Sequence, residues 1–180
     1  MNYYAVQVQT ARERTFIERI EKQLDFHSSS INLLFFQRRL LIKKNGEQKT
    51  ELRPLFPGYI FVETAEEISS NAVEMFRATQ FFTRFLKSNK EITPVTGHDL
   101  ELLHHFMQFG ETADISQVEF DENSRIIVKE GPLKGLEGCI INVDRHKKRV
   151  KIKIDFEDSP VTFDLSYTDI EKGVKNKKKD

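Results

Sequence analysis

Hydrophobic and polar residues follow different patterns in the two parts of the chain. In the first part, residues 3–9 alternate and place Tyr4, Val6 and Val8 on one face, which predicts a first strand. Residues 11–26 instead carry apolar side chains at helical spacing, which predicts an amphipathic helix. In the second part, short alternating runs predominate. The pattern therefore predicts a mixed α+β part followed by an all-strand part.

The first part continues with further strands and two more helices. Two extended runs lead to Asn45-Gly46, a strong two-residue hairpin signal, and a charged arm returns from it. Strand patterns fall at residues 31–36, 38–44, 47–53 and 81–86, and helical patterns at 65–77 and 97–107. We take the order as β-α-β-β-β-α-β-α, an α+β sandwich with a mainly antiparallel sheet over residues 1–109.

The run from Leu55 to Glu63 is the centre of this first part. A strand predicted at residues 60–62 follows a sharp bend at Pro57-Gly58. The run holds more apolar side chains than one face of one strand needs. Two interpretations remain open. Either the strand is buried on both faces, or Phe56 and Tyr59 form a partly exposed aromatic pocket for a partner.

The composition changes after residue 109. Residues 110–121 are acidic and carry no helical stripe, so they predict a linker. Residues 122–174 contain five short strand patterns, the last of them at 169–172, which predict a small closed β-barrel. Residues 175–180 form a solvated basic tail.

Charge and motif content exclude several classes of protein. The chain has 28 basic and 28 acidic residues, so only local patches predict a polyanion partner. It has one cysteine, Cys139, and therefore no internal disulfide. No run approaches the roughly 20 apolar residues of a membrane span, and we see no secretion signal, so we expect a cytoplasmic protein without membrane contact. Phosphate-loop, zinc and triad signatures are missing, and the adjacent His104-His105 cannot share a helix face; we expect no enzyme, cofactor or metal.

Three segments resemble a known family. Tyr3-Tyr4-Ala5-Val6-Gln7 and Phe56-Pro57-Gly58-Tyr59-Ile60 are similar to two signatures of a NusG N-terminal (NGN) domain. The run from Arg125 to Arg145 looks like a KOW motif, which also occurs in ribosomal proteins. In their order and spacing, the segments resemble the NusG family over nearly the whole chain. The resemblance implies a transcription elongation factor with an NGN domain at residues 1–109 and an SH3-like KOW barrel at 122–174.

The resemblance also implies a partner and the residues that bind it. NGN domains lie across the cleft of RNA polymerase, where an aromatic cavity receives the clamp helices of the β′ subunit. Carried onto this sequence, the cavity is lined by Tyr3, Tyr4, Phe56 and Tyr59. The opposite side of the cleft is contacted by Ser69, Ser70 and Asn71. The displaced non-template DNA strand is contacted by Arg12 and Arg14, unless these are simply solvated helix charges. We expect a monomer that disfavours paused polymerase without bond chemistry.

Basic residues gather in the hairpin at residues 38–53 and in a run at 145–153. The run consists of Arg145, His146, Lys147, Lys148, Arg149, Lys151 and Lys153. Alternation places the last three cations of this run on one face of a strand. The hairpin and the run can each be either a solvated surface or a surface that contacts nucleic acid. For the run, the expected nucleic acid is nascent RNA.

The loop at residues 131–138 helps to distinguish a general NusG factor from a specialised member of the family. The general factor usually has Phe where this chain has Leu136, and the loop and basic hairpin look more like the specialised antiterminators LoaP and, more distantly, RfaH. A candidate partner loop consists of Leu133, Lys134 and Leu136. The alternatives are a general factor whose KOW domain binds ribosomal protein S10 or Rho, and a ribosomal-type RNA-binding module that does not act on polymerase. Loop glycines and the alternation at 149–154 predict a permanent β-barrel instead of a helical hairpin.

Overall fold

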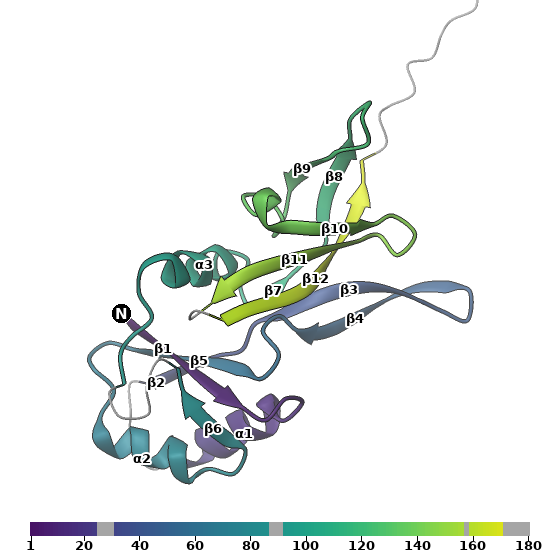
Figure 1. The fold of residues 1–180 in the computed structure, drawn as a ribbon. Coiled ribbons are helices and arrows are strands. Elements are labelled where there is room, and N and C mark those ends of the chain that lie inside the picture. Colours follow the sequence, from purple (N-terminus) through teal and green to yellow (C-terminus); the bar gives the residue numbers. More distant parts are fainter. Residues whose placement is uncertain (25–30, 87–91, 157–158, 171–180) are drawn as a thin grey trace, which may run out of the picture.

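The computed structural model describes residues 1–24, 31–86, 92–156 and 159–170 of the chain (Figure 1). The first part contains β1 (Asn2–Val8), α1 (Glu13–Leu24), β2 (Ile31–Leu34), β3 (Gln37–Lys44), β4 (Glu47–Pro54), β5 (Tyr59–Thr64), α2 (Ser70–Ala78), β6 (Phe82–Phe85) and α3 (Gly97–Met107). The second part contains β7 (Thr112–Ala113), β8 (Ser116–Phe120), β9 (Ile126–Glu130), the 3-10 turn η1 (Glu137–Cys139), β10 (Ile140–Asp144), β11 (Arg149–Phe156) and β12 (Ser159–Asp169). The basic tail predicted at 175–180 lies outside the described residues.

The first part is built on a four-stranded sheet with the order β2-β5-β1-β6. All of its pairings are antiparallel, as the sequence predicted. One face packs against α1 and α2 through a buried cluster that includes Phe16, Ile20 and Phe76. The mixed α+β class is confirmed. The predicted order was one strand short, because four strands, β2 to β5, separate the first two helices.

Strand β5 is buried on both faces, which settles the choice left open by its composition. Ile60 and Val62 belong to the cluster under α1 and α2. Phe61 belongs to a second cluster on the opposite face, and Tyr59 packs against it. Because side chains alternate along a strand, the two clusters lie on opposite sides of the sheet.

The β3–β4 hairpin forms where Asn45-Gly46 predicted it. Both turn residues have positive φ, 55° and 83°, as the tight hairpin turn requires. Lys44 pairs with Glu47, and β7 adds to the other side of β3 in parallel. The hairpin projects beyond the first sheet and runs alongside the second part of the chain (Figure 1).

The second part is a five-stranded sheet with the order β10-β11-β12-β8-β9. It includes β8, which lies in the stretch predicted as a linker, and β12 continues to Asp169 and pairs with β8 in parallel. The separate strand predicted at 169–172 does not begin at Asp169, because this residue ends β12; residues 171–172 lie outside the described residues. Strands β9 and β10 lie at opposite edges, and no pairing between them is found in the described residues, so the sheet is a half barrel.

Helix α2 begins five residues later than the pattern predicted. The Ser69 hydroxyl accepts a hydrogen bond from the Ala72 amide, and this cap fixes the first turn. Serine and asparagine compete for backbone hydrogen bonds within a helix but satisfy the free amides at its start. In α3, which forms over the predicted range, the buried residues are Leu102, Leu103 and Phe106.

Candidate functional site

The bend before β5 is held by a buried carboxylate. Glu13, at the start of α1, is 3% exposed and accepts a hydrogen bond from the Gly58 amide at 2.7 Å. The Gly58 carbonyl accepts from the Val8 amide at 2.8 Å. The bend is therefore tied to both β1 and α1, and it fixes the position of Phe56 and Tyr59. Sequence reasoning did not single out Glu13, because periodicity carries no signal for a contact with residue 58.

Replacing Gly58 with alanine should destabilise the first part by about 2–3 kcal/mol. Gly58 has a φ of +80°, and an added Cβ would lie 3.0 Å from Thr10 Oγ1 and 3.2 Å from the Val8 carbonyl oxygen. Gly46→Ala is the matched control, because Gly46 has a φ of +83° but nothing within 4 Å; it should cost only about 1 kcal/mol. Urea unfolding of both variants tests the difference, and equal losses would contradict it.

An aromatic cluster fills the face of the first sheet that α1 and α2 leave open. The Phe56 ring lies 5.6 Å from the rings of Phe61 and Phe106, measured between centroids. It also lies 5.8 Å from Phe156 and from Phe163, which belong to the C-terminal sheet. Aromatic pairs at such distances add about 0.5–1.5 kcal/mol each beyond their buried area. The C-terminal sheet therefore covers the aromatic face.

The structure separates the four residues that sequence reasoning assigned to one cavity. Tyr3 belongs to the same cluster as Phe56, and Tyr59 packs against that cluster and lies 6.4 Å from Phe156. Tyr4 lies on the opposite face, where its hydroxyl accepts a hydrogen bond from the Ile68 amide. Tyr3 and Tyr4 are neighbours on a strand, so they cannot line the same pocket.

Tyr3 lies between β5 and α3. Its hydroxyl donates to Glu63 Oε1 at 2.9 Å, and its ring meets His104 edge to face at 5.5 Å. Burial, followed by the hydrogen bond to the Glu63 carboxylate, raises the pKa of Tyr3 above its ordinary value. The tyrosine therefore remains a neutral donor, and its ring is held in the aromatic face.

Arg38 of β3 lies inside the covered interface. Its guanidinium lies over the Phe163 ring, 5.7 Å from the centroid, and donates to the Leu55 carbonyl at 3.4 Å. Its Nε is buried and has no hydrogen-bond partner. Burial lowers the pKa of Arg38 to about 10; Asp164 opposes this shift, and the positive charges of Arg149 and Arg53 add to it. The interface thus contains a charge that is only partly compensated.

Polar contacts also join the two parts. The Leu41 amide donates to Ser166 Oγ at 2.9 Å, and Arg149 donates to the Leu41 carbonyl at 3.0 Å. The Nε of Arg149 is buried without a partner, like that of Arg38. At the other end of the interface, His105 Nε2 lies 2.9 Å from the Pro132 carbonyl oxygen. These contacts fix the C-terminal sheet in one orientation on the first part.

The candidate partner loop is mostly covered. Leu133 and Leu136 are buried in the shared cluster, together with Leu103 and Phe106 of α3. Only Lys134 is exposed, and its ammonium group donates to the Lys129 carbonyl. A partner that recognises the two leucines therefore cannot reach them in this arrangement.

The residues expected to contact the far side of the cleft and DNA all lie on the surface. Ser69, Ser70 and Asn71 are exposed at the start of α2. Arg12 lies over the Phe81 ring at 5.4 Å, and Arg14 lies over Phe35 at 5.8 Å and donates to Gln37. Stacking on aromatic rings holds the two guanidinium groups in place while leaving them accessible.

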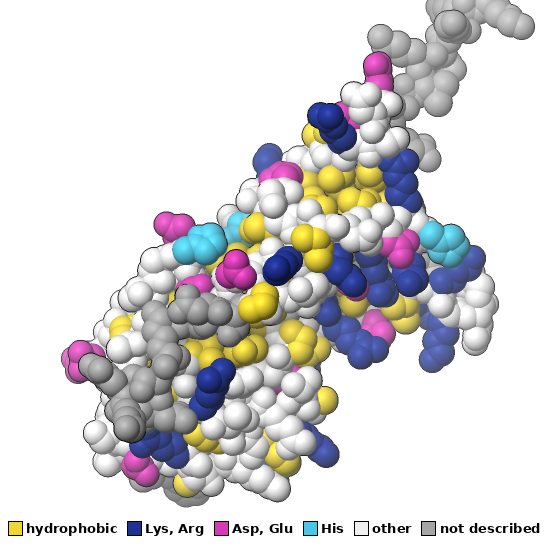
Figure 2. Space-filling view, viewed as in Figure 1, with side chains coloured by type: hydrophobic (Ala, Val, Ile, Leu, Met, Phe, Trp, Pro, Cys, Tyr) yellow, Lys and Arg dark blue, Asp and Glu magenta, His cyan; other side chains and the backbone are white. Residues whose placement is uncertain are grey.

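The basic run divides between two surroundings. Arg145 lies over the Phe120 ring at 4.1 Å and donates to the Ser124 carbonyl, away from the hairpin. Lys151 and Lys153 are exposed on β11, as the alternation predicted. The remaining members of the run, His146 to Arg149, line a groove beside the β3–β4 hairpin. Figure 2 shows Lys and Arg side chains gathered in this region.

Over the described ranges, no three His, Cys, Asp or Glu residues come together as a metal site would require. Of the helices in these ranges, none has the length and apolar character needed to cross a bilayer.

Comparison with known proteins agrees with this fold. A solved structure described as "Domain interaction in Thermotoga maritima NusG" superposes with a TM-score of 0.51 over 92% of this chain and 93% of that chain, at 16% identity. At this identity, the likeness concerns the fold alone.

The sequence comparisons establish the family. The family model described as "Transcription termination factor nusG" matches residues 1–104. The "Transcription termination/antitermination protein NusG" of Halalkalibacterium halodurans is 24% identical over 177 residues, 95% of this chain and 98% of its own. The protein of the same description from Neisseria meningitidis is 27% identical over 133 residues, 72% of each chain. The chain belongs to the NusG family of transcription termination/antitermination factors, a class of transcription factors and not of enzymes.

Proposed function

We propose that this chain binds RNA polymerase across its cleft through the aromatic face of the first part. The observation that carries this proposal is the position of Phe56. It contacts four other phenylalanine rings, and two of these belong to the covering C-terminal sheet. The face thus has the shape and chemistry to hold an apolar partner. The clamp-helix tip of the β′ subunit, expected from the family resemblance, would bind in place of Phe156 and Phe163.

Binding of this kind concentrates affinity in a few buried aromatics. The contact residues are Tyr3, Phe56 and Tyr59, with the bend at Gly58 holding the last two in position. Tyr4 supports the opposite face of the strand. Because the C-terminal sheet occupies the face, the sheet must leave before the clamp helices bind. The measured affinity then falls in proportion to the fraction of open molecules.

A bound factor would act by selecting one state of polymerase. It spans the cleft from the aromatic face to Ser69, Ser70 and Asn71 on the far side, and it favours the closed clamp and disfavours pausing. Arg12 and Arg14, which are fixed on aromatic rings, contact the displaced non-template strand. Residues 1–109 and 122–174 act as the polymerase-binding and KOW units, and the stretch 110–121 joins them while supplying β7 to the hairpin and β8 to the C-terminal sheet.

We favour a specialised processive antiterminator. The support is the basic hairpin and the basic run of the C-terminal sheet, which suit contact with nascent RNA. The second candidate is a general factor whose KOW part binds ribosomal protein S10 or Rho. That partner would need Leu133 and Leu136, which are buried here, so it also requires the sheet to leave.

The polymerase contact is tested by binding of the full chain to core RNA polymerase. All variants compared also carry Phe156→Ala, which loosens the covering C-terminal sheet and exposes the aromatic face. Adding Phe56→Ala should weaken binding by about 2 kcal/mol or more, roughly thirtyfold, because a central aromatic is lost.

Adding Tyr4→Phe to the same background is the control. It should leave the affinity for polymerase unchanged, since Tyr4 faces the helices, although it removes the acceptor of the Ile68 amide. Polymerase binding that is indifferent to Phe56→Ala would refute the aromatic contact.

A further inference from the structure

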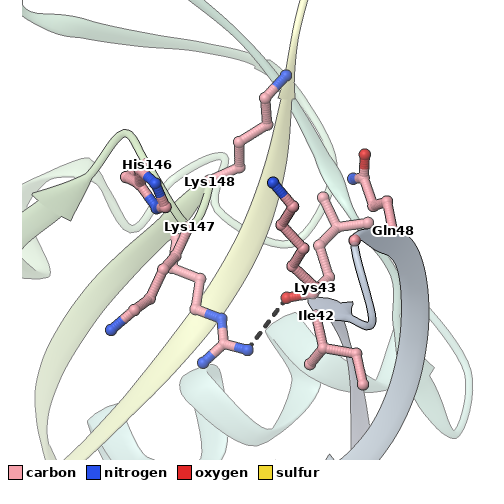
Figure 3. A pocket seen from close by; sticks show the side chains of 9 residues that line it. Ile42, Lys43, Gln48, His146, Lys147 and Lys148 are labelled. Carbon is pink, nitrogen blue, oxygen red and sulfur yellow. Dashed lines mark hydrogen bonds between the residues drawn. The ribbon is translucent and has the colours of Figure 1, made fainter.

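A basic groove lies between the two parts of the chain. Its walls are Lys43, Gly46 and Gln48 of the β3–β4 hairpin on one side, and the β10–β11 turn, His146 to Arg149, on the other. Leu41 and Ile42 supply apolar surface, and the groove has a volume of about 610 Å³. Figure 3 shows the side chains of Lys43 and Gln48 on one wall and those of His146, Lys147 and Lys148 on the other.

The charges of the groove are all of one sign. Four of its lining residues, Lys43, Lys147, Lys148 and Arg149, are permanent cations, and none of the described lining residues is acidic. Lys147 lies 3.7 Å from Asp144, and Lys148 lies 3.3 Å from Asp169; both pairs are at the surface. Within the described part of the chain, no side-chain ion pair or hydrogen bond is found for Lys43, whereas the His146 backbone amide donates to the Asp144 carboxylate. The Asp144 and Asp169 carboxylates offset part of the charge, and the potential of the groove stays positive because its four cations outnumber them.

Arg149 brings one of these positive charges into the interface between the two parts of the chain. It donates to the Leu41 carbonyl across the groove, while its buried Nε has no partner. Cations from the two parts thus face each other across a groove with no acidic lining residue, although Asp144 and Asp164 lie beside Arg149 outside it. Such an arrangement opposes docking of the C-terminal sheet unless a negatively charged group enters.

We propose that this groove binds the phosphate backbone of a single nucleic-acid strand across both parts of the chain. The inference rests on the nucleic-acid contact proposed above for the basic run, and it adds the hairpin as the second wall. The His146 imidazole is the one aromatic ring among the described residues that line the groove, so base stacking contributes little. Binding is therefore led by phosphate, tolerant of sequence and dependent on salt.

The two walls make binding depend on the docked arrangement. A strand held by both Lys43 and the β10–β11 turn stabilises the covered form, because a ligand favours the state that it binds. The same strand therefore disfavours exposure of the aromatic face, and the two binding events oppose each other.

The first test compares two lysines of one hairpin. The affinity of the full chain for an unstructured RNA oligonucleotide, and for DNA of the same sequence, is measured by fluorescence anisotropy. Lys43→Ala should weaken binding on the order of fivefold and reduce the slope of log affinity against log salt by about 0.7. Lys49→Ala is the matched control: it removes the same charge from the same hairpin, outside the groove, and should have little effect.

The second test uses the covering sheet. Phe156→Ala loosens docking and should therefore weaken oligonucleotide binding, whereas it should strengthen polymerase binding. Opposite changes in the two affinities support the shared groove. Loss of oligonucleotide binding on Lys148→Ala but not on Lys43→Ala or Phe156→Ala would overturn the groove and leave a contact on the turn alone.

Equal losses for Lys43→Ala and Lys49→Ala would also overturn the groove, because the attraction would then be a property of net charge. Failure of the unaltered chain to bind either oligonucleotide at low salt would overturn both the groove and the nucleic-acid contact, with the polymerase contact untouched. Equal binding of RNA and DNA agrees with recognition of phosphate alone. Stronger binding of RNA also agrees and assigns the strand to RNA through its 2′-hydroxyls.

Discussion

Replacing Phe156 with alanine is expected to strengthen binding to core RNA polymerase on the order of tenfold or more. The Phe156 side chain contacts Phe56, Tyr59 and Phe61 of the first part, and it is 2% exposed. Loss of a buried Phe side chain costs about 3–5 kcal/mol, and a factor of ten in an equilibrium corresponds to only about 1.4 kcal/mol. The variant therefore shifts the chain towards the form with an open aromatic face.

The matched control is Phe120→Ala. Phe120 belongs to the C-terminal sheet but packs on Tyr167 and under Arg145, and among the described residues its ring meets no aromatic ring of the first part. It should destabilise the sheet without opening the face to the same extent. If Phe156→Ala unfolds the sheet altogether, the face is still exposed and the increase still follows. Unchanged polymerase binding for Phe156→Ala would show that the covering sheet does not limit the contact.

Replacing Arg38 with methionine is expected to act in the opposite direction and weaken polymerase binding, again on the order of tenfold. The buried guanidinium, with its unpaired Nε, destabilises the docked sheet, whereas an unbranched apolar side chain keeps its packing on Phe163. Exchange of a buried charge for an apolar group is often stabilising by about 1–4 kcal/mol. Loss of the contacts with Leu55 and Asp164 offsets part of this gain, so we expect the lower half of that range.

The lowered pKa of Arg38 also indicates that its positive charge destabilises the docked sheet. A base whose pKa is lowered in the docked form, here to about 10, favours docking less when it is protonated. The cost is fully present at neutral pH and declines only as the pH rises through about 10. Methionine removes this cost at every pH.

Arg39→Met is the matched control for Arg38→Met. Arg39 is the next residue of β3, but its guanidinium forms a surface ion pair with Asp114 at 3.1 Å. Surface pairs contribute about 0–1 kcal/mol, so polymerase binding should hardly change. Comparable effects at the two positions would indicate that charge on the hairpin, and not burial in the interface, controls docking.

Local signals predicted the elements that depend on neighbours in sequence. Asn45-Gly46 placed the hairpin turn, and the alternation of Val150, Ile152 and Ile154 placed the inward face of β11. Strand β8 was missed, because an acidic stretch with one large buried residue, Val118, has no pattern of its own. It becomes a strand because β9 and β12 pair with it on either side.

The candidate site was predicted in part. The resemblance pointed to Phe56 and Tyr59, and the structure places both on one aromatic face with Tyr3. It also assigned Tyr4, although the alternation of β1 already excluded two neighbours from one pocket. Nothing in the sequence indicated that Arg38 and Phe163 meet in the interface. A charged residue on a strand is usually solvated, and an inward-facing phenylalanine usually packs in the core of its own sheet.

The sequence by itself determined the resemblance to the family and the position of the hairpin, because both follow from short motifs, and it offered the double burial of β5 as one of two interpretations. Only the tertiary structure decided that the C-terminal sheet covers the aromatic face and that the hairpin meets the β10–β11 turn. The contacts responsible join Leu41 to Arg149 and Ser166, which are 108 and 125 residues away along the chain. Periodicity records which side of an element is apolar, but it does not record which distant surface will bury that side.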